Sequence, residues 1–354
     1  MASDGPPKRG CDGLMRAVWC LTAALGISCL LTSALRRYAL GRGLVDIPNA
    51  RSSHHQPTPR AGGLAIVVTF LAGLPLLQHW GALSVHAVVA LAGAAGGVAL
   101  IGLWDDHGHV PARWRLLAHF AAAGWALAWL GGLPPLSMLG ASLEPGRVGL
   151  GLGAIYLVWL VNSYNFMDGI DGIAVVQAMT VCLGGVLLCA PFGHEWLVPA
   201  LLAAAAAGFL LWNFPVAQIF LGDVGSGFLG MTLGILSIQA AWLAPELLWS
   251  WIILMGVFVV DSTVTLLRRM HRRERLYEAH RSHAYQHAAR KHGHVPVTLA
   301  VGAINLLWLM PVALLVGFKR LDGVAGVVVA YLPLTCAALR YGAGVQEVRD
   351  VDYP

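Results

Sequence analysis

The stretch N-S-Y-N-F-M-D-G-I-D-G-I-A, residues 162–174, ends one hydrophobic segment and begins the next. Its polar residues Asn162, Asn165, Asp168 and Asp171 recur every three positions. Residues three apart are neighbours in helical geometry, so the two acids can face one ligand, and the glycines that follow them allow close approach of backbone. Charge at membrane depth is costly and usually functional. We therefore interpret the stretch as part of a site at a membrane boundary; a polar turn between two spans is the alternative.

The composition around this stretch is that of a membrane protein. Of 354 residues, 57% are hydrophobic and only 12% are charged, and the mean hydropathy is +0.68, whereas about a quarter of an ordinary globular domain is charged. We expect an all-α, polytopic integral membrane protein. Since a span needs about 20 apolar residues, the apolar windows predict about eleven transmembrane helices, at 14–34, 61–78, 85–104, 114–130, 149–166, 172–190, 197–214, 226–243, 247–267, 298–317 and 321–339.

The basic residues predict the orientation. With eleven spans, seventeen of the 23 Lys and Arg fall on one side of the membrane, which the positive-inside rule makes the cytoplasm. The N-terminus is then outside and the C-terminus cytoplasmic. We divide the chain into a short polar tail (1–13), a transmembrane catalytic domain (14–340) and a cytoplasmic tail (341–354). The domain has five cytoplasmic loops, at 35–60, 105–113, 167–171, 215–225 and 268–297.

The first two inside loops contain groups suited to phosphate and metal. The first carries R-S-S-H-H-Q-P-T-P-R, in which Arg51, His54 and Arg60 are donors for phosphate oxygens; simple compliance with the positive-inside rule is the alternative. The second places Asp105 beside Asp106, with basic residues eight to ten positions further on. Adjacent carboxylates raise at least one pKa, which suits a proton acceptor.

The fourth and fifth inside loops add further candidates. Asp223 lies between Gly222 and Gly225 before the eighth span, where a helix N-terminus favours phosphate; that Asp223 or Ser226 simply caps the helix is the alternative. The fifth loop contains H-R-S-H, residues 280–283. No cysteine or acid completes a zinc set at familiar spacing, so we expect phosphate recognition there.

Together these residues predict a phosphoryl-transfer site at the cytoplasmic boundary. Magnesium commonly binds few protein carboxylates plus substrate phosphates, and phosphoryl transfer needs mainly positioning and charge neutralisation. We expect a phosphorylated substrate from the cytoplasm and a second substrate in the bilayer. The charge asymmetry gives no reason to expect nucleic acid.

At these motifs the chain resembles the polyprenyl-phosphate N-acetylhexosamine-1-phosphate transferases (the MraY/WecA superfamily, glycosyltransferase family 4). The resemblance covers about residues 14–340 and rests on D-I-P-N-A-R-S-S-H, P-T-P-R-A-G-G, D-D, N-F-M-D-G-I-D-G, N-F-P-V-A-Q-I-F-L-G-D-V-G-S and H-R-S-H-A-Y-Q. It implies transfer of N-acetylhexosamine-1-phosphate from a UDP-sugar to a polyprenyl phosphate such as undecaprenyl phosphate, which releases UMP. It also implies Mg²⁺, with Mn²⁺ as an alternative, in a multi-pass protein of the bacterial cytoplasmic (inner) membrane.

The resemblance also implies roles for individual residues. Asp223, Asp106 and Asp105 are expected as metal ligands, and Asp105 as the proton acceptor. The catalytic set is Asp105, Asp106, Asp223 and His280. The expected substrate-binding residues are Arg51, His54, Arg60, Asn162, Asn165, Asp168, Asp171, Asn213, Phe220, Arg281 and His283. In this assignment Asp168 and Asp171 form the floor of the nucleotide-diphosphate site instead of a metal pair. Direct and two-step transfer both stay open.

Departures from the family pattern predict the branch. Peptidoglycan-precursor members usually have a lysine soon after the paired acids and three near-consecutive histidines. Here His107, Gly108 and His109 follow the pair and the late motif is H-R-S-H, which is more similar to enzymes that initiate O-antigen or other surface polysaccharides. A phospho-MurNAc-pentapeptide transferase is the alternative. A proton-coupled transporter is a distant one, since transporter acids usually lie near the midplane. The identity of the N-acetylhexosamine is open, and an apolar face among the spans could support a homodimer.

Overall fold

The computed structural model describes residues 9–43, 45–46, 57–108, 110–274 and 280–345. Within them the regular secondary structure is helical apart from two short antiparallel strand pairs, β1 with β2 and β3 with β4, so the all-α prediction is confirmed. Helices are expected of apolar segments, because a backbone in hydrocarbon must satisfy its hydrogen bonds internally.

The helices in the first half of the chain are α1 (Arg9–Arg42), α2 (Leu64–His79), α3 (Val85–Ala90), η1 (Leu91–Ala95), α4 (Gly96–His107), α5 (Ala112–Leu130) and α6 (Gly146–Met167). Those in the second half are α7 (Ile173–Cys189), η2 (Ala190–Phe192), α8 (Leu197–Asn213), α9 (Gly222–Leu243), α10 (Glu246–Leu254), α11 (Gly256–His271), α12 (Ala284–His292), α13 (His294–Ile304), η3 (Asn305–Leu309), α14 (Met310–Gly317) and α15 (Gly323–Arg340). The strands are β1 (Val45–Asp46), β2 (Thr58–Pro59), β3 (Leu136–Met138) and β4 (Ala141–Leu143).

Each of the eleven predicted spans coincides with helix. Seven described helical segments are long and apolar enough to cross a membrane, and α10 with α11, bent by 72°, makes eight if the pair is one span. The other three predicted spans fall on α2, α5 and α8; of these, α2 has 16 residues and α8 has 17. The chain is therefore a polytopic membrane protein, while the count of eleven and the orientation stay predictions.

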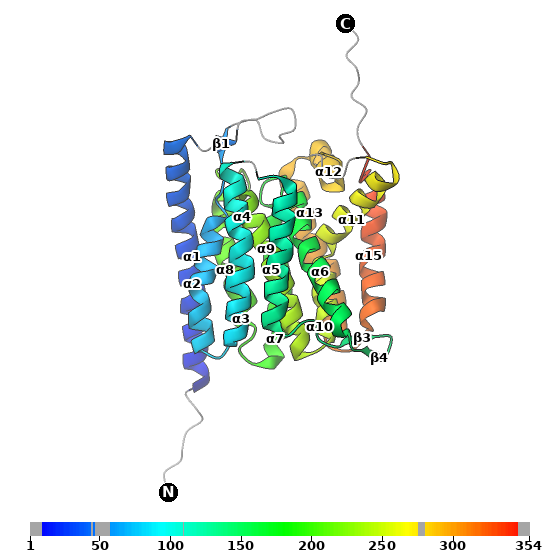
Figure 1. The fold of residues 1–354 in the computed structure, drawn as a ribbon. Helices are drawn as coiled ribbons and strands as arrows, with labels where there is room; N and C mark the ends of the chain where they lie inside the picture. Colours follow the sequence, from blue (N-terminus) through cyan, green and yellow to red (C-terminus); the bar gives the residue numbers. More distant parts are fainter. Residues whose placement is uncertain (1–8, 44, 47–56, 109, 275–279, 346–354) are drawn as a thin grey trace.

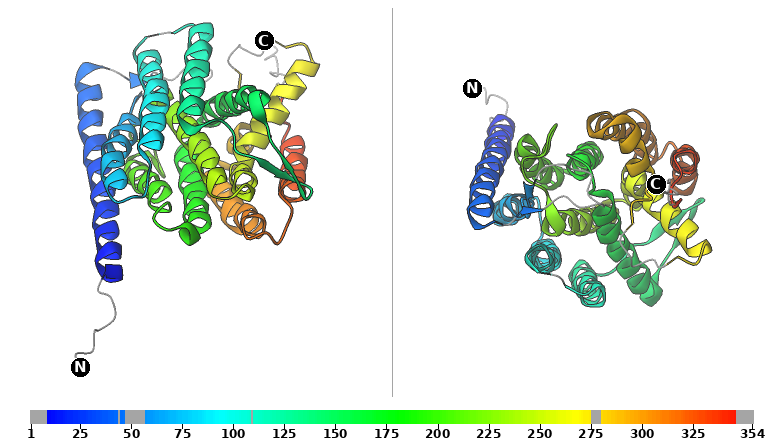
Figure 2. Two further views of the ribbon diagram at one scale, coloured as in Figure 1. Left: turned by 60° about the horizontal axis from the view of Figure 1, so that its bottom comes forward. Right: turned by 90° about the horizontal axis from the view of Figure 1, so that it is seen from above.

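Helix α9 is the central element of the bundle. Buried residues make up 94% of its most apolar window, against 17% for α1. Viewed along the helices, α1 and α15 lie at opposite edges, with α9 between them (Figure 2). The start of α9 carries Asp223. The fold therefore places this acid among several neighbouring helices instead of on a peripheral loop.

The two ends of the bundle carry different structures. β1 and α12 lie at one end, and the β3–β4 hairpin lies at the other (Figure 1). α1 begins at the hairpin end and α15 finishes at the end where α12 lies (Figure 1). The end with β1 and α12 is the one that receives the predicted inside loops.

Two predicted loops contain more helix than expected. In the predicted loop at 268–297, α11 continues to His271, and α12 and the start of α13 fall inside it. α12 is rich in polar residues, so hydropathy gave no sign of it. The loop at 215–225 ends early, because α9 already begins at Gly222.

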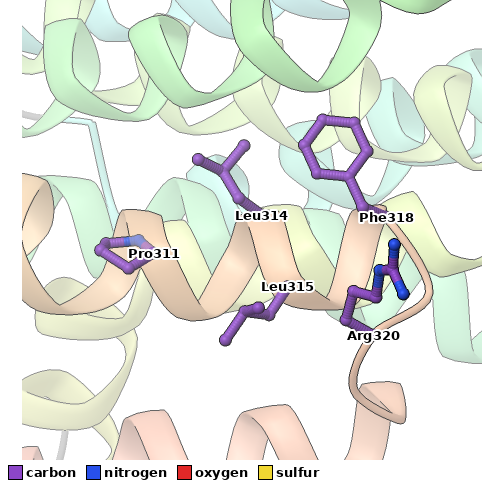
Figure 3. A pocket seen from close by; sticks show the side chains of 5 residues that line it. All are labelled: Pro311, Leu314, Leu315, Phe318 and Arg320. Carbon is purple, nitrogen blue, oxygen red and sulfur yellow. The ribbon is translucent and has the colours of Figure 1, made fainter.

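An apolar groove lies on the outer side of α14. Pro311, Leu314, Leu315 and Phe318 line it, with Arg320 at one end (Figure 3). Leu315 and Phe318 are about half exposed. No predicted site residue lies in this groove, so the candidate site has to be built from contacts at the ends of the helices.

Candidate active site

The paired acids at the end of α4 face the start of α9. Both oxygens of Asp106 accept backbone hydrogen bonds, from Asp223 N at 3.0 Å and Val224 N at 3.1 Å. The first amides of a helix have no partners within it, and Leu221, which precedes α9, provides no side-chain cap. Asp106 thus caps α9 from another helix. Whether it also binds metal stays a prediction.

Asp105 and Asp223 are joined by one guanidinium group. Arg115 Nη1 donates to Asp223 Oδ2 at 2.7 Å and also to Asp105 Oδ2. The other Asp105 oxygen accepts from Val110 N at 2.8 Å. Two carboxylates that share the Arg115 cation are close enough to share a metal ion, so the structure brings together two of the three predicted metal ligands; that they bind metal stays a prediction.

Asn165 connects residues 162–174, which we call the opening stretch, to Asp105 and Asp223. Its Nδ2 donates to Asp223 Oδ1 at 2.8 Å and lies 3.3 Å from Ser226 Oγ. The side chain of Asp223 is therefore held by Asn165 and Arg115 and does not cap its own helix. The structure contradicts the capping alternative for Asp223.

Asp168 follows directly after α6 and lies in the same acidic neighbourhood. Burial raises its pKa to about 8, with further contributions from the negative charges of Asp223, Asp106 and Asp171. A carboxyl group with this pKa is largely protonated near pH 7 and can donate a hydrogen bond. The next residue, Gly169, lies under the Tyr285 hydroxyl, which a Cβ atom would overlap.

Asp171 and Asn213 hold the loop before α9. Asp171 Oδ2 accepts from Ala217 N at 3.2 Å, and its Oδ1 lies 3.4 Å from His294 Nδ1. Asn213 is 4% exposed. It accepts from Gly172 N at 3.0 Å and donates to Ile219 O at 2.9 Å. These contacts fix the opening stretch to the loop at 214–221.

The first inside loop joins the same region through its backbone. Phe220 N donates to Pro59 O at 2.8 Å, and Gly62 N donates to Phe220 O at 2.9 Å. Arg60 pairs with Asp46 at 2.5 Å and is about half exposed. The predicted Arg51 and His54 lie outside the described residues. Their role as substrate ligands stays a prediction.

The H-R-S-H segment precedes α12. His283 is 3% exposed, and its ring stacks on Phe166 at 6.0 Å between centroids. Burial, together with the charges of His283 and Arg269, lowers the pKa of His280 to about 3. His280 is therefore neutral near pH 7. A neutral imidazole can form hydrogen bonds with a diphosphate, whereas the guanidinium group of Arg281 carries a positive charge; that either residue binds the substrate stays a prediction.

The structure differs from the predicted set of site residues at two positions, Asn162 and Asp261. Asn162 donates to Val158 O at 2.7 Å, so this hydrogen bond of its side chain lies within its own helix and not at the acids. Asp261, in α11, was not among the predicted site residues. It is 6% exposed and accepts hydrogen bonds from Ala284 N and Tyr285 N. The sequence does carry a signal for Asp261: it is an acid within an apolar helix, and such residues usually have a functional role.

The family model for glycosyl transferase family 4 matches residues 87–241, which contain the paired acids, the opening stretch and the start of α9. The chain is also 28% identical to a probable undecaprenyl-phosphate N-acetylglucosaminyl 1-phosphate transferase of Bacillus subtilis, over 77% of each chain. Over this part, the chain is similar to glycosyl transferase family 4.

Two further relatives are similar over shorter stretches. A decaprenyl-phosphate N-acetylglucosaminephosphotransferase of Mycolicibacterium smegmatis is 32% identical over 62% of this chain, and the match spans 59% of that relative. A phospho-N-acetylmuramoyl-pentapeptide-transferase of Rhodopseudomonas palustris is 27% identical over 68% of this chain and 78% of its own length. The family match ends at residue 241, before the H-R-S-H segment, so only the contacts of that segment bear on its role.

The donor set fits the divalent cation that the family resemblance implies. Among the described residues, no group of three or more His, Cys, Asp or Glu side chains is placed to hold a metal. Asp105 and Asp223 nevertheless bring two carboxylates together beside the carboxamide of Asn165. Mg²⁺ is typically held by one or two carboxylates, with waters and substrate phosphates completing its shell. These residues suit Mg²⁺ better than a zinc ion, which prefers nitrogen and sulfur ligands.

Proposed function

We propose that the protein transfers N-acetylglucosamine-1-phosphate from UDP-N-acetylglucosamine to a polyprenyl phosphate, the first step in the synthesis of a surface glycan. The similarity to the Bacillus and Mycolicibacterium N-acetylglucosaminyl phosphotransferases supports both the sugar and the lipid. The observation that carries the proposal is the meeting of Asp105, Asp223 and Asn165 at the start of the central helix.

In the proposed reaction, an oxygen of the lipid phosphate attacks the phosphorus that bears the sugar. The bond from that phosphorus to the oxygen of UMP breaks, so polyprenyl-diphosphate-sugar and UMP form. Asp105 would take up a proton from the lipid phosphate. Direct attack needs no enzyme-bound intermediate, and the site requires only positioning and charge neutralisation for it.

Asp105 and Asp223 would hold Mg²⁺, which would neutralise charge on the transferring phosphate. Asn165 keeps the Asp223 carboxylate in place, and Asp106 keeps the first turn of α9 in place. Arg115, already shared by both carboxylates, supplies a positive charge next to the reacting phosphates. His280 and Arg281 would bind the diphosphate, and Asp168 the nucleotide.

The resemblance and the positive-inside count support an active site on the cytoplasmic face, where the UDP-sugar is available. The H-R-S-H form supports the surface-polysaccharide branch. The Rhodopseudomonas relative keeps a phospho-MurNAc-pentapeptide transferase as the second candidate.

The test is purified full-length protein in detergent with undecaprenyl phosphate, MgCl₂ and a panel of UDP-sugars. We expect UMP release and a lipid-diphosphate sugar with UDP-N-acetylglucosamine, loss of both with EDTA, and recovery with added Mg²⁺. Turnover with UDP-MurNAc-pentapeptide alone would establish the second candidate. No UMP release with any of these donors would overturn the transferase proposal.

A further inference from the structure

Asp261 is a buried acid that contacts the first residues of α12 and His283, which precedes them. Its Oδ1 accepts from Ala284 N at 3.0 Å and its Oδ2 accepts from Tyr285 N at 2.9 Å. His283 Nδ1 lies 3.4 Å from Oδ1. Asp261 lies in α11, 23 positions earlier in the chain than Ala284. Both oxygens therefore serve one distant helix start.

One of the amide partners of Asp261 also contacts the opening stretch, next to the candidate active site. Tyr285, one of its two amide partners, donates its hydroxyl hydrogen to Phe166 O at 3.0 Å. Gly169 packs directly under the same hydroxyl, next to Asp168. The start of α12 therefore contacts the opening stretch through the Tyr285 hydroxyl and Asp261 through two backbone amides.

We propose that Asp261 is a positioning residue that fixes the H-R-S-H segment for binding of the UDP-sugar. The inference rests on the proposed function for the nature of the donor. Its geometric part, that Asp261 anchors the start of α12, rests on contacts alone. Asp261 does not touch the reacting atoms in this assignment; it acts through His283, Ala284 and Tyr285, which follow His280 and Arg281 along the chain.

A matched control exists at the opposite end of the bundle. Asp322 also accepts hydrogen bonds from two amides at a helix start: its Oδ1 accepts from Val324 N at 2.9 Å and Ala325 N at 3.1 Å in α15. Its Oδ2 accepts from Leu139 N, in the turn between β3 and β4. Asp322 is the local N-cap of its helix, whereas Asp261 acts from another helix. Each acid nevertheless holds the first amides of one helix, and of the two only Asp261 contacts the helix that follows the H-R-S-H segment.

The experiment compares Asp261→Asn and Asp322→Asn in the full-length protein. We expect D261N to raise the KM for UDP-N-acetylglucosamine about tenfold while the KM for undecaprenyl phosphate stays unchanged. Hydrogen exchange should accelerate in peptides that contain Ala284 and Tyr285. D322N should lower the thermal midpoint without changing the donor KM or that exchange. A residue that only stabilises the fold would reduce the active fraction and leave both KM values alone.

The outcomes separate this inference from the proposed function. An unchanged donor KM in D261N, or unchanged exchange at the start of α12, overturns the positioning role. If the wild-type protein shows no turnover, the proposed function fails, and the exchange data still decide whether Asp261 anchors α12. Where D261N does not fold, Asp261→Glu keeps the charge, displaces both oxygens by one methylene, and is judged by the same measurements.

Discussion

Gly102 should be one of the most sensitive positions in the protein, although it has no functional group. It lies in α4, one turn before Asp106, and its Cα faces the first turn of α9. A Cβ atom at Gly102 would lie 2.5 Å from the backbone carbonyl carbon of Asp223 and 2.6 Å from Val224 N. Since carbon atoms normally approach to about 3.5 Å, Gly102→Ala has to move α4 and α9 apart by roughly 1 Å.

That displacement affects stability and catalysis together. The hydrogen bonds from Asp223 and Val224 to Asp106, now 3.0 and 3.1 Å long, would lengthen beyond useful range. Overpacking costs about 1–3 kcal/mol, and each hydrogen bond to a charged group contributes about 1.5–3 kcal/mol. We expect a loss of ~3 kcal/mol in unfolding free energy after partial relaxation. Because a 1 Å misplacement can cost ~100-fold in rate, turnover should fall by about that factor.

The assay is the rate of UMP release at saturating substrates, with the thermal midpoint measured on the same samples. Gly97→Ala is the control: Gly97 is in the same helix, and a Cβ there meets nothing within 4 Å. We expect G97A to be neutral or to gain up to ~1 kcal/mol from helix propensity. If G102A turns over within threefold of the wild type and melts like G97A, the close contact between α4 and α9 does not determine the site geometry.

Three further predictions concern single side chains. Asp223→Asn should abolish turnover and weaken Mn²⁺ binding measured by electron paramagnetic resonance in the absence of substrate; near-normal values for both would remove Asp223 from the metal site. Asn213→Ala leaves two buried backbone groups without their present partner, so unfolding should become about 2 kcal/mol easier, whereas Asn162→Ala, which loses only a contact within its own helix, should change the melting temperature little. The pKa of Asp168, about 8, exceeds its unfolded value, so the folded state binds more protons and metal-free stability should fall from about pH 4 to 8. The thermal midpoint of Asp168→Asn in EDTA should be less dependent on pH over that range, and an unchanged slope would exclude Asp168 as its source.

Hydropathy was sufficient to predict the membrane-spanning part of the fold. Every predicted window coincides with helix, because in an apolar segment length and composition nearly determine the structure. The count is harder, since α2 and α8 are short and α10 and α11 are bent at Met255. The helical content of 268–297 was missed for a different reason. A polar, amphipathic helix such as α12 is stabilised by its packing, which a hydropathy window does not measure.

The site was predictable wherever an acid stood out at the end of a span. Asp105, Asp223 and Asn165 were predicted from polarity and family resemblance, and the structure brings them together. The arrangement of their partners was not predictable. Arg115 was noted only as a nearby basic residue, but it joins Asp105 to Asp223. Asp261 was not predicted, because the candidates came from the polar loops and this acid lies within an apolar helix.

The capping of α9 explains why the capping alternative for Asp223 does not hold. Sequence rules look for a cap within a residue or so of the helix start, and they offered Asp223 or Ser226. In the structure, α9 is capped by Asp106 of α4, and α12 has Asp261 of α11 in addition to its own capping box of His283 and Gln286. Because a distant carboxylate satisfies the first amides of α9, the Asp223 side chain is released from that task. It can face Asp105 and Asn165, which is the arrangement that a phosphoryl-transfer site needs.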